Sequence, residues 1–406
     1  MYLPFVMPTS FKFKIAVLAL LLLSGKLFAQ GFTPSTDPKL QKIGFTVQED
    51  TAWTSIFHRS KGWFGADGIF SIPMDAVDSI GAAKKQTTFF VFSDSLIGEV
   101  IDNKAKNTVM PHNTMAYIKG NIPSADAIKF YWDTTAKGKP ESMFIPHTPN
   151  TKPGDYFWLG DGFVNTALHN TTYLFGYRIK NTKNGIGFQE VGNVLIAIPK
   201  GSKPPFKDQR QMDTPFYFDE GGGFHGSFGA GILNNSASAK VPGADGFVYI
   251  YGIRTPQKSV VVARVKPKDF EKFDRWVFFD GKGWIRDMNK AAAIADRASN
   301  EMSVTPLPDG RYAMVFQMDG ISKWVAMRLG SSPYGPFGPI INLYNTDRYG
   351  GKVITYNAKA HPTLSRPGEL LITYNVNFTD FFNQLNATPD IYRPRFVRVI
   401  FDKAKE

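Results

Sequence analysis

Two aspartates stand at the ends of neighbouring short segments that have strand-forming composition. Asp67 lies in "GADG" (residues 65–68), ahead of the predicted strand "IFSIP", and Asp94 closes the predicted strand "FFVFSD". Adjacent antiparallel strands can bring such end residues to within about 5 Å of each other. Two close carboxyl groups push their pKa values apart, which leaves one protonated and one ionised. Hydrolysis of a glycosidic bond needs such a pair, one group as acid and the other as base or nucleophile.

Each of these aspartates also has a structural explanation. Glycine and aspartate are depleted in strands, so Asp67 also fits a turn in which it caps its own backbone. Asp94 fits an Asx-type turn ahead of Ser95. The residues alone leave both explanations open, and they do not say which aspartate is the acid.

Three further carboxylates are candidates for binding a substrate. Asp161 in "LGDG" repeats the local pattern around Asp67, and Glu301 precedes the predicted strand "MSVTPL". Glu220 lies beside three glycines in "FDEGGGFHG", where the backbone can approach a ligand closely. The structural alternatives are a repeated turn for Asp161, a salt bridge between sheets for Glu301 and a connector for Glu220.

Histidines and tryptophans near these markers complete the predicted site. His225 has glycine neighbours, and His361 is held extended by the proline that follows it, so either could donate a hydrogen bond to a sugar. Trp63 and Trp158 lie just ahead of Asp67 and Asp161 and are candidate stacking surfaces for sugar rings. The alternatives are structural histidines and tryptophans of the hydrophobic core.

The sequence predicts no catalytic metal and no required cofactor. The chain has no cysteine, and its six histidines show no His-x-x-x-His spacing typical of zinc enzymes. Neither a Gly-x-Ser-x-Gly elbow nor a phosphate-binding P-loop is present. A structural calcium or sodium ion held by oxygen ligands leaves little trace in a sequence and stays open.

The elements that position these residues are predicted to be strands. Short aromatic-rich segments alternate with Gly, Pro and Asn turns, and the clearest helical pattern is confined to 286–299. Strand units recur every 60 to 94 residues, and their first strands are marked by Asp67, Asp161, Gly229, Glu301 and His361. This recurrence predicts an all-β, five-bladed β-propeller whose inner strands bring the markers into one central pocket. Two stacked β-sandwiches are the alternative.

The N-terminal residues are typical of a signal peptide. Lys12 and Lys14 precede the apolar run 15–23, which is too short to span a bilayer and ends in small residues suited to cleavage after Ala29. We therefore predict a signal peptide at 1–29, a single domain at 30–406, and a periplasmic or extracellular protein with no stable membrane insertion after cleavage. An uncleaved anchor is the alternative.

The charge distribution indicates which class of molecule the protein binds. The chain carries a formal net charge of +12, but its basic residues are scattered and mixed with acidic ones. Nucleic-acid binding favours a concentrated basic patch, so we predict no nucleic-acid partner. The predicted partner is a polysaccharide or oligosaccharide substrate, bound by a monomer.

Several motifs carry a family resemblance over nearly all of the predicted mature chain. They are "GADG" (65–68), "FVFSDSLIG" (90–98), "WLGDGFV" (158–164), "NEMSVTPLPDGRY" (300–312), "SSPYGPF" (331–337) and "AHPTLSRPGELLITYNVN" (360–377). With these the chain resembles the five-bladed β-propellers of the glycoside-hydrolase type, and among them the domain-of-unknown-function propellers that include endo-D-arabinanases. "FSDS" departs mildly from that group's usual Phe-Gly-Asp-Thr and keeps the aspartate. The resemblance implies catalytic aspartates at the motifs of Asp67 and Asp94.

These observations together predict an exported glycoside hydrolase. The resemblance alone implies the substrate, a furanose-containing polysaccharide such as an arabinan or D-arabinan. Two alternatives remain at this point. One is a non-catalytic carbohydrate-binding propeller of a glycan-uptake system, and the other is a lyase that acts on acidic polysaccharide.

Overall fold

The computed structural model describes residues 31–183, 187–221, 224–347, 352–380, 384 and 388–402, without the side chains of 220, 221 and 224. Residues Phe32–Glu406 form one compact unit. The predicted signal peptide lies outside the described residues. In the described part of the chain, no helix has the length and apolar character needed to cross a bilayer.

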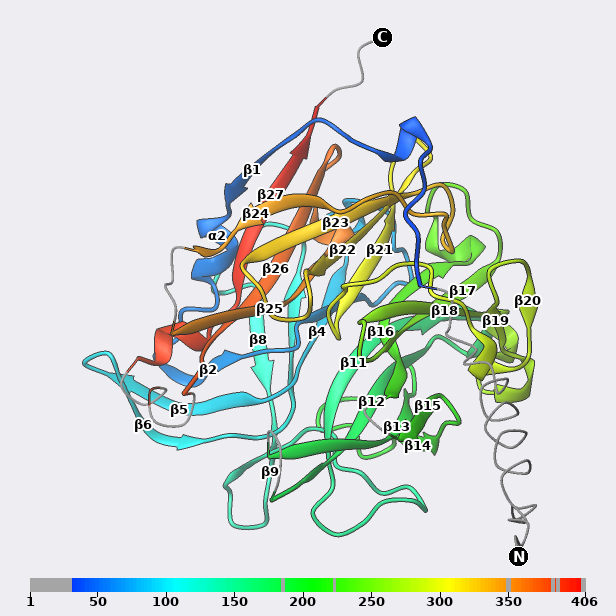
Figure 1. The fold of residues 1–406 in the computed structure, drawn as a ribbon. Coiled ribbons are helices and arrows are strands. Elements are labelled where there is room, and N and C mark those ends of the chain that lie inside the picture. The colour runs from blue at the N-terminus through cyan, green and yellow to red at the C-terminus, as the bar shows by residue number, and fades with distance from the viewer. Residues whose placement is uncertain are drawn as a thin grey trace, which may run out of the picture. The chain divides into compact units, whose positions relative to one another are not determined.

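Antiparallel sheets make up the structure, as the sequence predicts, and the all-β prediction is confirmed (Figure 1). Four of the sheets have four strands. Sheet C contains, in order, β3 (Phe70–Pro73), β4 (Thr87–Phe92), β7 (Thr114–Lys119) and β8 (Ile128–Tyr131). Sheet E contains β11 (Tyr156–Asn165), β12 (Thr171–Asn181), β13 (Phe188–Ile198) and β14 (Arg210–Asp213). Sheet G contains β21 (Met302–Pro306), β22 (Tyr312–Gln317), β23 (Trp324–Gly330) and β24 (Ile341–Asn345).

The fourth four-stranded sheet joins the two ends of the described chain. Sheet A contains β25 (Val353–Ala360), β26 (Glu369–Phe378), β27 (Arg395–Phe401) and, at its outer edge, the first strand β1 (Phe45–Glu49). Figure 1 shows β1 in blue beside β27 in red, and the two strands pair from Phe45↔Phe401 to Glu49↔Val397. The N-terminal strand therefore completes the sheet that the C-terminal strands begin.

The remaining strands form one six-stranded sheet and two small ones. Sheet F contains β15 (Tyr217–Gly221), β16 (Phe224–Asn235), β17 (Phe247–Arg254), β18 (Ser259–Val265), β19 (Val277–Phe279) and β20 (Trp284–Ile285). Sheet B contains β2 (Lys61–Ala66), β5 (Ser95–Ile101) and β6 (Lys104–Val109). Strands β9 (Asp133–Thr134) and β10 (Pro140–Glu141) pair with each other.

Helices are few and short in the described part of the chain. The α-helix α2 covers Thr51–Ser55. The 3-10 helices are η1 (Pro38–Leu40), η2 (Ala82–Lys85), η3 (Thr166–Leu168), η4 (Ala237–Ala239), η5 (Pro267–Asp269), η6 (Phe273–Arg275), η7 (Met288–Lys290), η9 (Pro362–Leu364) and η10 (Pro389–Tyr392).

The helical pattern at 286–299 does not form a helix beyond η7. Its backbone runs alongside β18 instead, where Val260 and Ala295 form an antiparallel bridge. Ile294, Ala295 and Ala298 pack in the core between sheets F and G. Tertiary packing of the apolar side chains therefore outweighs the local helical preference of this alanine-rich segment.

The hydrophobic cores lie between successive sheets. Separate clusters of buried residues fill the spaces between sheets C and E, E and F, F and G, and G and A, and a further cluster lies between A and C. One strand of each sheet contacts the next in the same order, β3 to β11, β11 to β16, β16 to β21 and β21 to β25; these are first strands except in sheet F, where the strand is the second, β16. This order of sheets is β-propeller-like and differs from two stacked sandwiches, which bury one core within each pair of sheets. The number of blades stays a prediction.

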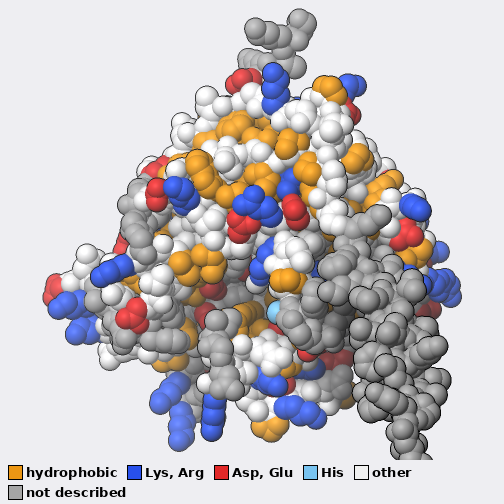
Figure 2. Space-filling view, in the orientation of Figure 1, with side chains coloured by type: hydrophobic (Ala, Val, Ile, Leu, Met, Phe, Trp, Pro, Cys, Tyr) orange, Lys and Arg blue, Asp and Glu red, His pale blue; other side chains and the backbone are white. Residues whose placement is uncertain are grey.

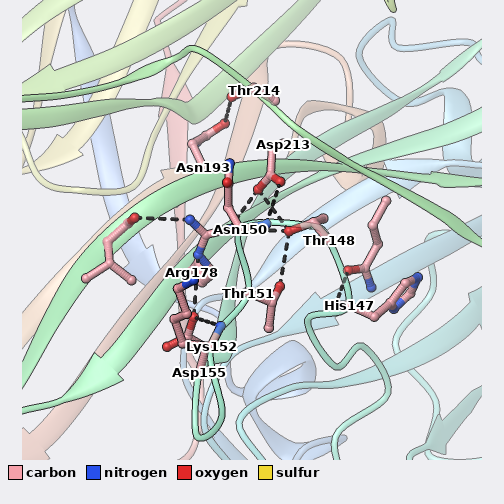
Figure 3. Close-up of polar contacts among 12 residues, drawn as sticks. His147, Thr148, Asn150, Thr151, Lys152, Asp155, Arg178, Asn193, Asp213 and Thr214 are labelled. Carbon is pink, nitrogen blue, oxygen red and sulfur yellow. Dashed lines mark hydrogen bonds and ion pairs between the residues drawn. The ribbon is translucent and has the colours of Figure 1, made fainter.

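A buried arginine anchors the segment that leads into β11 (Figure 3). Arg178 on β12 donates to Asp213 Oδ1 at 2.7 Å and lies 3.6 Å from Asp155 Oδ2. Thr148 also donates to Asp213 Oδ1, at 2.9 Å, and the backbone N–H of Asn150 donates to Asp213 Oδ2 at 3.2 Å. These contacts hold residues 148–155 against sheet E, and the next residue begins the strand that carries Asp161.

We predict that Arg178→Ala lowers the free energy of unfolding by about 3 kcal/mol, because it leaves two largely buried carboxylates without their cation. Urea unfolding monitored by circular dichroism measures the change. Arg210→Ala is the matched control, since Arg210 pairs with Glu271 but is mostly exposed and should lose less than about 1 kcal/mol. Equal losses in the two variants would contradict an anchoring role for Arg178.

Candidate functional site

The structure brings Asp67 and Asp94 together, as the sequence predicts. Asp67 follows β2 and precedes β3, and Asp94 lies between β4 and β5. The backbone N–H of Asp67 donates to the carbonyl of Asp94 at 3.3 Å, and the N–H of Ser93 donates to the carbonyl of Asp67 at 2.9 Å. Both aspartates keep part of their surface exposed. The two carboxyl groups therefore share one partly open location.

Close backbone packing explains the glycines on either side of Asp67. Gly68 has a φ of +63°, and a Cβ there would lie 2.6 Å from Ser93 Oγ. A Cβ on Gly65 would lie 2.7 Å from the carbonyl oxygen of Tyr392. Both contacts are shorter than real Cβ atoms tolerate, so this turn excludes larger residues and holds Asp67 in one place.

Burial and neighbouring charges keep Asp67 protonated at neutral pH. Burial, followed by the charges of Asp94 and Glu301, raises the pKa of Asp67 to about 8. Tyr356 donates to Asp67 Oδ2 at 2.9 Å, and this bond, with one from Tyr392, opposes the increase in pKa only partly. Burial also raises the pKa of both tyrosines well above the usual value, so they remain donors.

Asp94 has a different partner from Asp67. His112 Nδ1 lies 2.8 Å from Asp94 Oδ1, within hydrogen-bond distance. The side chains of His112 and Asp94 are 33% and 18% exposed, so the pair can be reached from solvent. The His112 ring stacks on Tyr156 with centroids 3.6 Å apart, which fixes its orientation. The two neighbouring aspartates thus have different partners, tyrosine hydroxyls for Asp67 and the His112 ring for Asp94.

Asp161 lies in a β-bulge on β11. The pairing of β11 with β12 shifts between Leu159 and Gly162, and such a bulge redirects a side chain. Asp161 Oδ2 accepts the backbone N–H of Ile232 on β16 at 2.7 Å, and Oδ1 accepts the N–H of Gly162 at 2.8 Å. Burial raises the pKa of Asp161 to about 7. The carboxyl group therefore joins two neighbouring sheets. With a pKa of about 7, it is protonated in part of the molecules at neutral pH.

Glu301 forms a buried ion pair with Lys359 on β25. Glu301 Oε1 also accepts a hydrogen bond from Asn357 Nδ2 at 2.7 Å. Lys359 lies 4.4 Å from the centroid of the Phe70 ring on β3, so its ammonium group joins sheets A, C and the start of G. Burial raises the pKa of Glu301, although Lys359 opposes the change. The salt-bridge explanation of Glu301 matches this geometry.

Two more buried carboxyl groups were not singled out by sequence reasoning. Burial raises the pKa of Asp78 to about 7, and Asn234 donates to its Oδ2 at 2.9 Å. Burial raises the pKa of Glu190 to about 8, and its Oε1 has no hydrogen-bond partner among the described residues. The charge of Asp161 contributes to the raised pKa of Asp78, so these two carboxyl groups interact electrostatically.

Trp63 and His361 lie in the interior instead of on a binding surface. Trp63 is 2% exposed, stacks on Phe130 at 4.3 Å, and donates from Nε1 to Thr114 Oγ1. His361 is 1% exposed, and its two ring nitrogens bond to Ser71 and Thr373, each at 2.8 Å. Neither side chain has a free face or nitrogen for a sugar, because core packing and inter-sheet bonds occupy them.

The other predicted binding residues have mixed placements. Trp158 is partly exposed on β11 and lies edge-on to Phe188 at 4.6 Å, so it remains available as a stacking surface. His225 is exposed, and among the described residues it bonds to Thr255 but to none of the carboxyl groups above. The side chain of Glu220 lies outside the described residues.

Contacts between distant segments explain why several residues of the site were missed. Tyr356, Tyr392 and Lys359 contact partners from other sheets, and Tyr356 lies 289 positions from Asp67. His112 is only 18 positions from Asp94, but nothing in its spacing distinguishes it from the other histidines. Among the described residues, no group of three or more His, Asp or Glu side chains is arranged to hold a metal ion.

We predict that Asp67→Asn stabilises the protein at high pH. A folded-state pKa near 8, against an ordinary value of 3.8, means that unfolding releases a proton and that stability falls as the pH rises from about 4 to 8. Asparagine lacks this dependence, so the variant should gain on the order of 1–2 kcal/mol over the wild type at pH 8, and less at pH 5.

Thermal unfolding at the two pH values measures this gain. Asp319→Asn is the control, since Arg297 lowers the pKa of Asp319 and its loss should bring no gain at pH 8. If Asp67→Asn changed stability equally at both pH values, the carboxyl group of Asp67 would not be held neutral.

Comparison with known proteins places the chain in a family. No curated protein matches it. Among solved structures, a putative hydrolase from Bacteroides ovatus is 20% identical, with a TM-score of 0.66 over 91% of this chain and 93% of that chain. The α-L-arabinofuranosidase PaAbf62A from Podospora anserina, in complex with cellotriose, is 13% identical, with a TM-score of 0.40 over 85% of this chain and 98% of that chain.

The first of these similarities extends over nearly the whole of both chains and shows a shared fold. The sequence profile of the domain of unknown function DUF5005 matches residues 50–401, which include every element from α2 to β27. The chain therefore belongs to the DUF5005 family.

Proposed function

We propose that this protein is a glycoside hydrolase with Asp67 and Asp94 as its catalytic pair. The observation that carries the proposal is the opposite environment of two adjacent carboxyl groups: Asp67 is bonded to tyrosine hydroxyls, and Asp94 is bonded to the His112 ring. Hydrolysis of a glycosidic bond needs one neutral and one ionised carboxyl group at the same location.

In this mechanism Asp67 is the general acid. Its pKa of about 8 leaves it protonated at neutral pH, so it can give its proton to the oxygen of the leaving sugar as the glycosidic bond breaks. The hydroxyl group of Tyr356 then stabilises the carboxylate that forms, because it already donates to Oδ2.

Asp94 is the base or nucleophile of the pair. In this role it accepts the N–H of His112 through Oδ1, and its other oxygen takes a proton from water or attacks the sugar. Glu301 acts on Asp67 through its charge, Asp161 joins β11 to β16, and Trp158 offers a ring on the neighbouring sheet.

The tyrosines beside Asp67 favour a hydrolase over a lyase. A lyase of this kind would need a histidine or tyrosine to remove a proton from the sugar, whereas burial keeps Tyr356 and Tyr392 protonated at neutral pH. A non-catalytic binding protein would not need an aspartate of raised pKa beside a second carboxyl group.

The finer features of the proposal rest on the sequence. We propose five blades, built on sheets C, E, F, G and A, and a substrate containing furanose sugars, an arabinan or D-arabinan, from the sequence resemblance. Export to the periplasm or beyond rests on the signal-like residues 1–29. We also propose a monomer that needs no cofactor.

We predict that Asp67→Asn and Asp94→Asn each lower the rate of sugar release at least 100-fold while the fold and the binding of polysaccharide are kept. The measurement is reducing-sugar release from a panel of furanose and pyranose polysaccharides, including linear arabinan and D-arabinan. Asp319→Asn, on an exposed ion pair, is the control and should keep full activity.

Each outcome of this panel has a distinct meaning. Activity that survives both substitutions would move the chemistry to other residues. Binding without release from any polymer would favour the binding-protein alternative. Products that absorb in the ultraviolet as unsaturated sugars would identify a lyase.

We also predict that kcat/KM falls on the alkaline side with a midpoint near pH 8, because Asp67 must be protonated to act as the acid. Initial rates from pH 5 to 10 on the most active polymer measure the profile. A profile that stays flat up to pH 10 would exclude Asp67 as the acid.

A further inference from the structure

A surface groove lies between two strand edges, away from the carboxyl groups described above. Its volume is about 360 Å³, and residues 59 and 61–63 line one side and residues 128–132 the other. β2 is the edge strand of sheet B and β8 is the edge strand of sheet C. The backbone groups on these edges that do not pair within a sheet can bond to hydroxyl groups of a ligand.

Aromatic rings form the wall of the groove. Phe130 stacks on the buried Trp63, and the guanidinium group of Arg59 lies 5.9 Å from the Phe130 ring centroid. Trp132 lies against Gly62, where a Cβ would come within 3.3 Å of its ring. Trp132 keeps part of its surface exposed, whereas the Tyr131 ring packs against Tyr117 on the other face of β8. The groove therefore offers aromatic faces held in place by their neighbours.

The charged residues of the groove all carry the same sign. Arg59, Lys61 and Lys129 line it, and none of its nine lining residues is acidic. Lys61 and Lys129 are exposed, and neither forms an ion pair with a described residue, although Glu99 lies opposite Lys61 on β5. Asp133, which follows Trp132, is already paired with Lys207 at 2.7 Å. Lys61 and Lys129 thus have no ion-pair partner among the described residues, whereas Arg59 donates to the carbonyl of Ala125.

We propose that this groove is a second carbohydrate-binding site, which takes a polysaccharide chain bearing carboxylate or sulfate groups. A sugar ring would lie on Trp132, and the anionic groups would pair with Lys61 and Lys129 through charge-assisted hydrogen bonds. Gly62 and Asp67 are five residues apart along β2, roughly 16 Å at the rise of a strand. The groove therefore holds the polymer at a distance from the aspartate pair, and its existence does not depend on the proposed hydrolysis.

The test is binding of the full-length protein to polygalacturonate and to a sulfated galactan, measured by affinity electrophoresis at low and high salt. Methyl-esterified polygalacturonan is the neutral comparison. We expect binding to both anionic polymers that weakens with salt, and at least tenfold weaker binding to the ester. The two polymers distinguish a preference for carboxylate from one for sulfate.

Variants assign the binding to the groove. Lys61→Gln/Lys129→Gln should weaken binding at least tenfold and leave the packing intact, and Trp132→Ala should weaken it independently of charge. Lys180→Gln/Lys268→Gln, which removes two exposed lysines elsewhere, is the matched control and should bind as the wild type does. Asp67→Asn should also bind normally.

Three results would overturn the proposal. The first is no binding of the wild type to either anionic polymer, and the second is unchanged binding in the Lys61→Gln/Lys129→Gln variant. The third is single-stranded DNA displacing polygalacturonate with equal or higher affinity, which would assign the groove to nucleic acid.

Discussion

The buried ion pair between Glu301 and Lys359 is the interaction on which the centre of the structure depends. Lys359 lies on β25, contacts Glu301 just before β21, and faces the ring of Phe70 on β3. It therefore links three of the sheets at their inner strands. Its charge also acts on Asp161, whose pKa it lowers against the effect of burial. A neutral side chain at this position would leave buried carboxyl groups with no nearby compensating charge.

The strands around this ion pair are held close by residues that have little or no side chain. Gly65 and Gly68 pack against Tyr392 and Ser93, and a Cβ on Gly160 would lie 2.7 Å from the carbonyl oxygen of Gly229. Strands β11, β16 and β25 each contain a bulge, which adds residues that have no partner on the neighbouring strand. The close approach of backbones limits water around the carboxyl groups, and this limited solvation is what raises their pKa values.

Figure 2 shows how the charges are distributed on one face of the molecule. Lysine and arginine side chains lie dispersed among acidic, polar and hydrophobic ones, without one continuous block of either sign. Local chemistry, and not net charge, therefore decides what each part of the surface can bind. The carboxyl groups at the inner strands and the cations of the β2–β8 groove suit different ligands, although they belong to the same chain.

The sequence by itself determined the strand composition and the proximity of Asp67 and Asp94, because these depend on local alternation and on turns between neighbouring strands. It did not fix the first strand of every sheet, since the predicted first strand at Gly229 is the second strand of sheet F and His361 follows β25. Only the tertiary structure decided which side chains meet. It buried Trp63 and His361, converted the helical pattern at 286–299 into an extended segment, and supplied Tyr356 and His112 as partners of the two aspartates. Tyr356, the partner of Asp67, comes from the other end of the chain. The packing of separate sheets brings the two residues together, and this packing leaves no local pattern in the sequence.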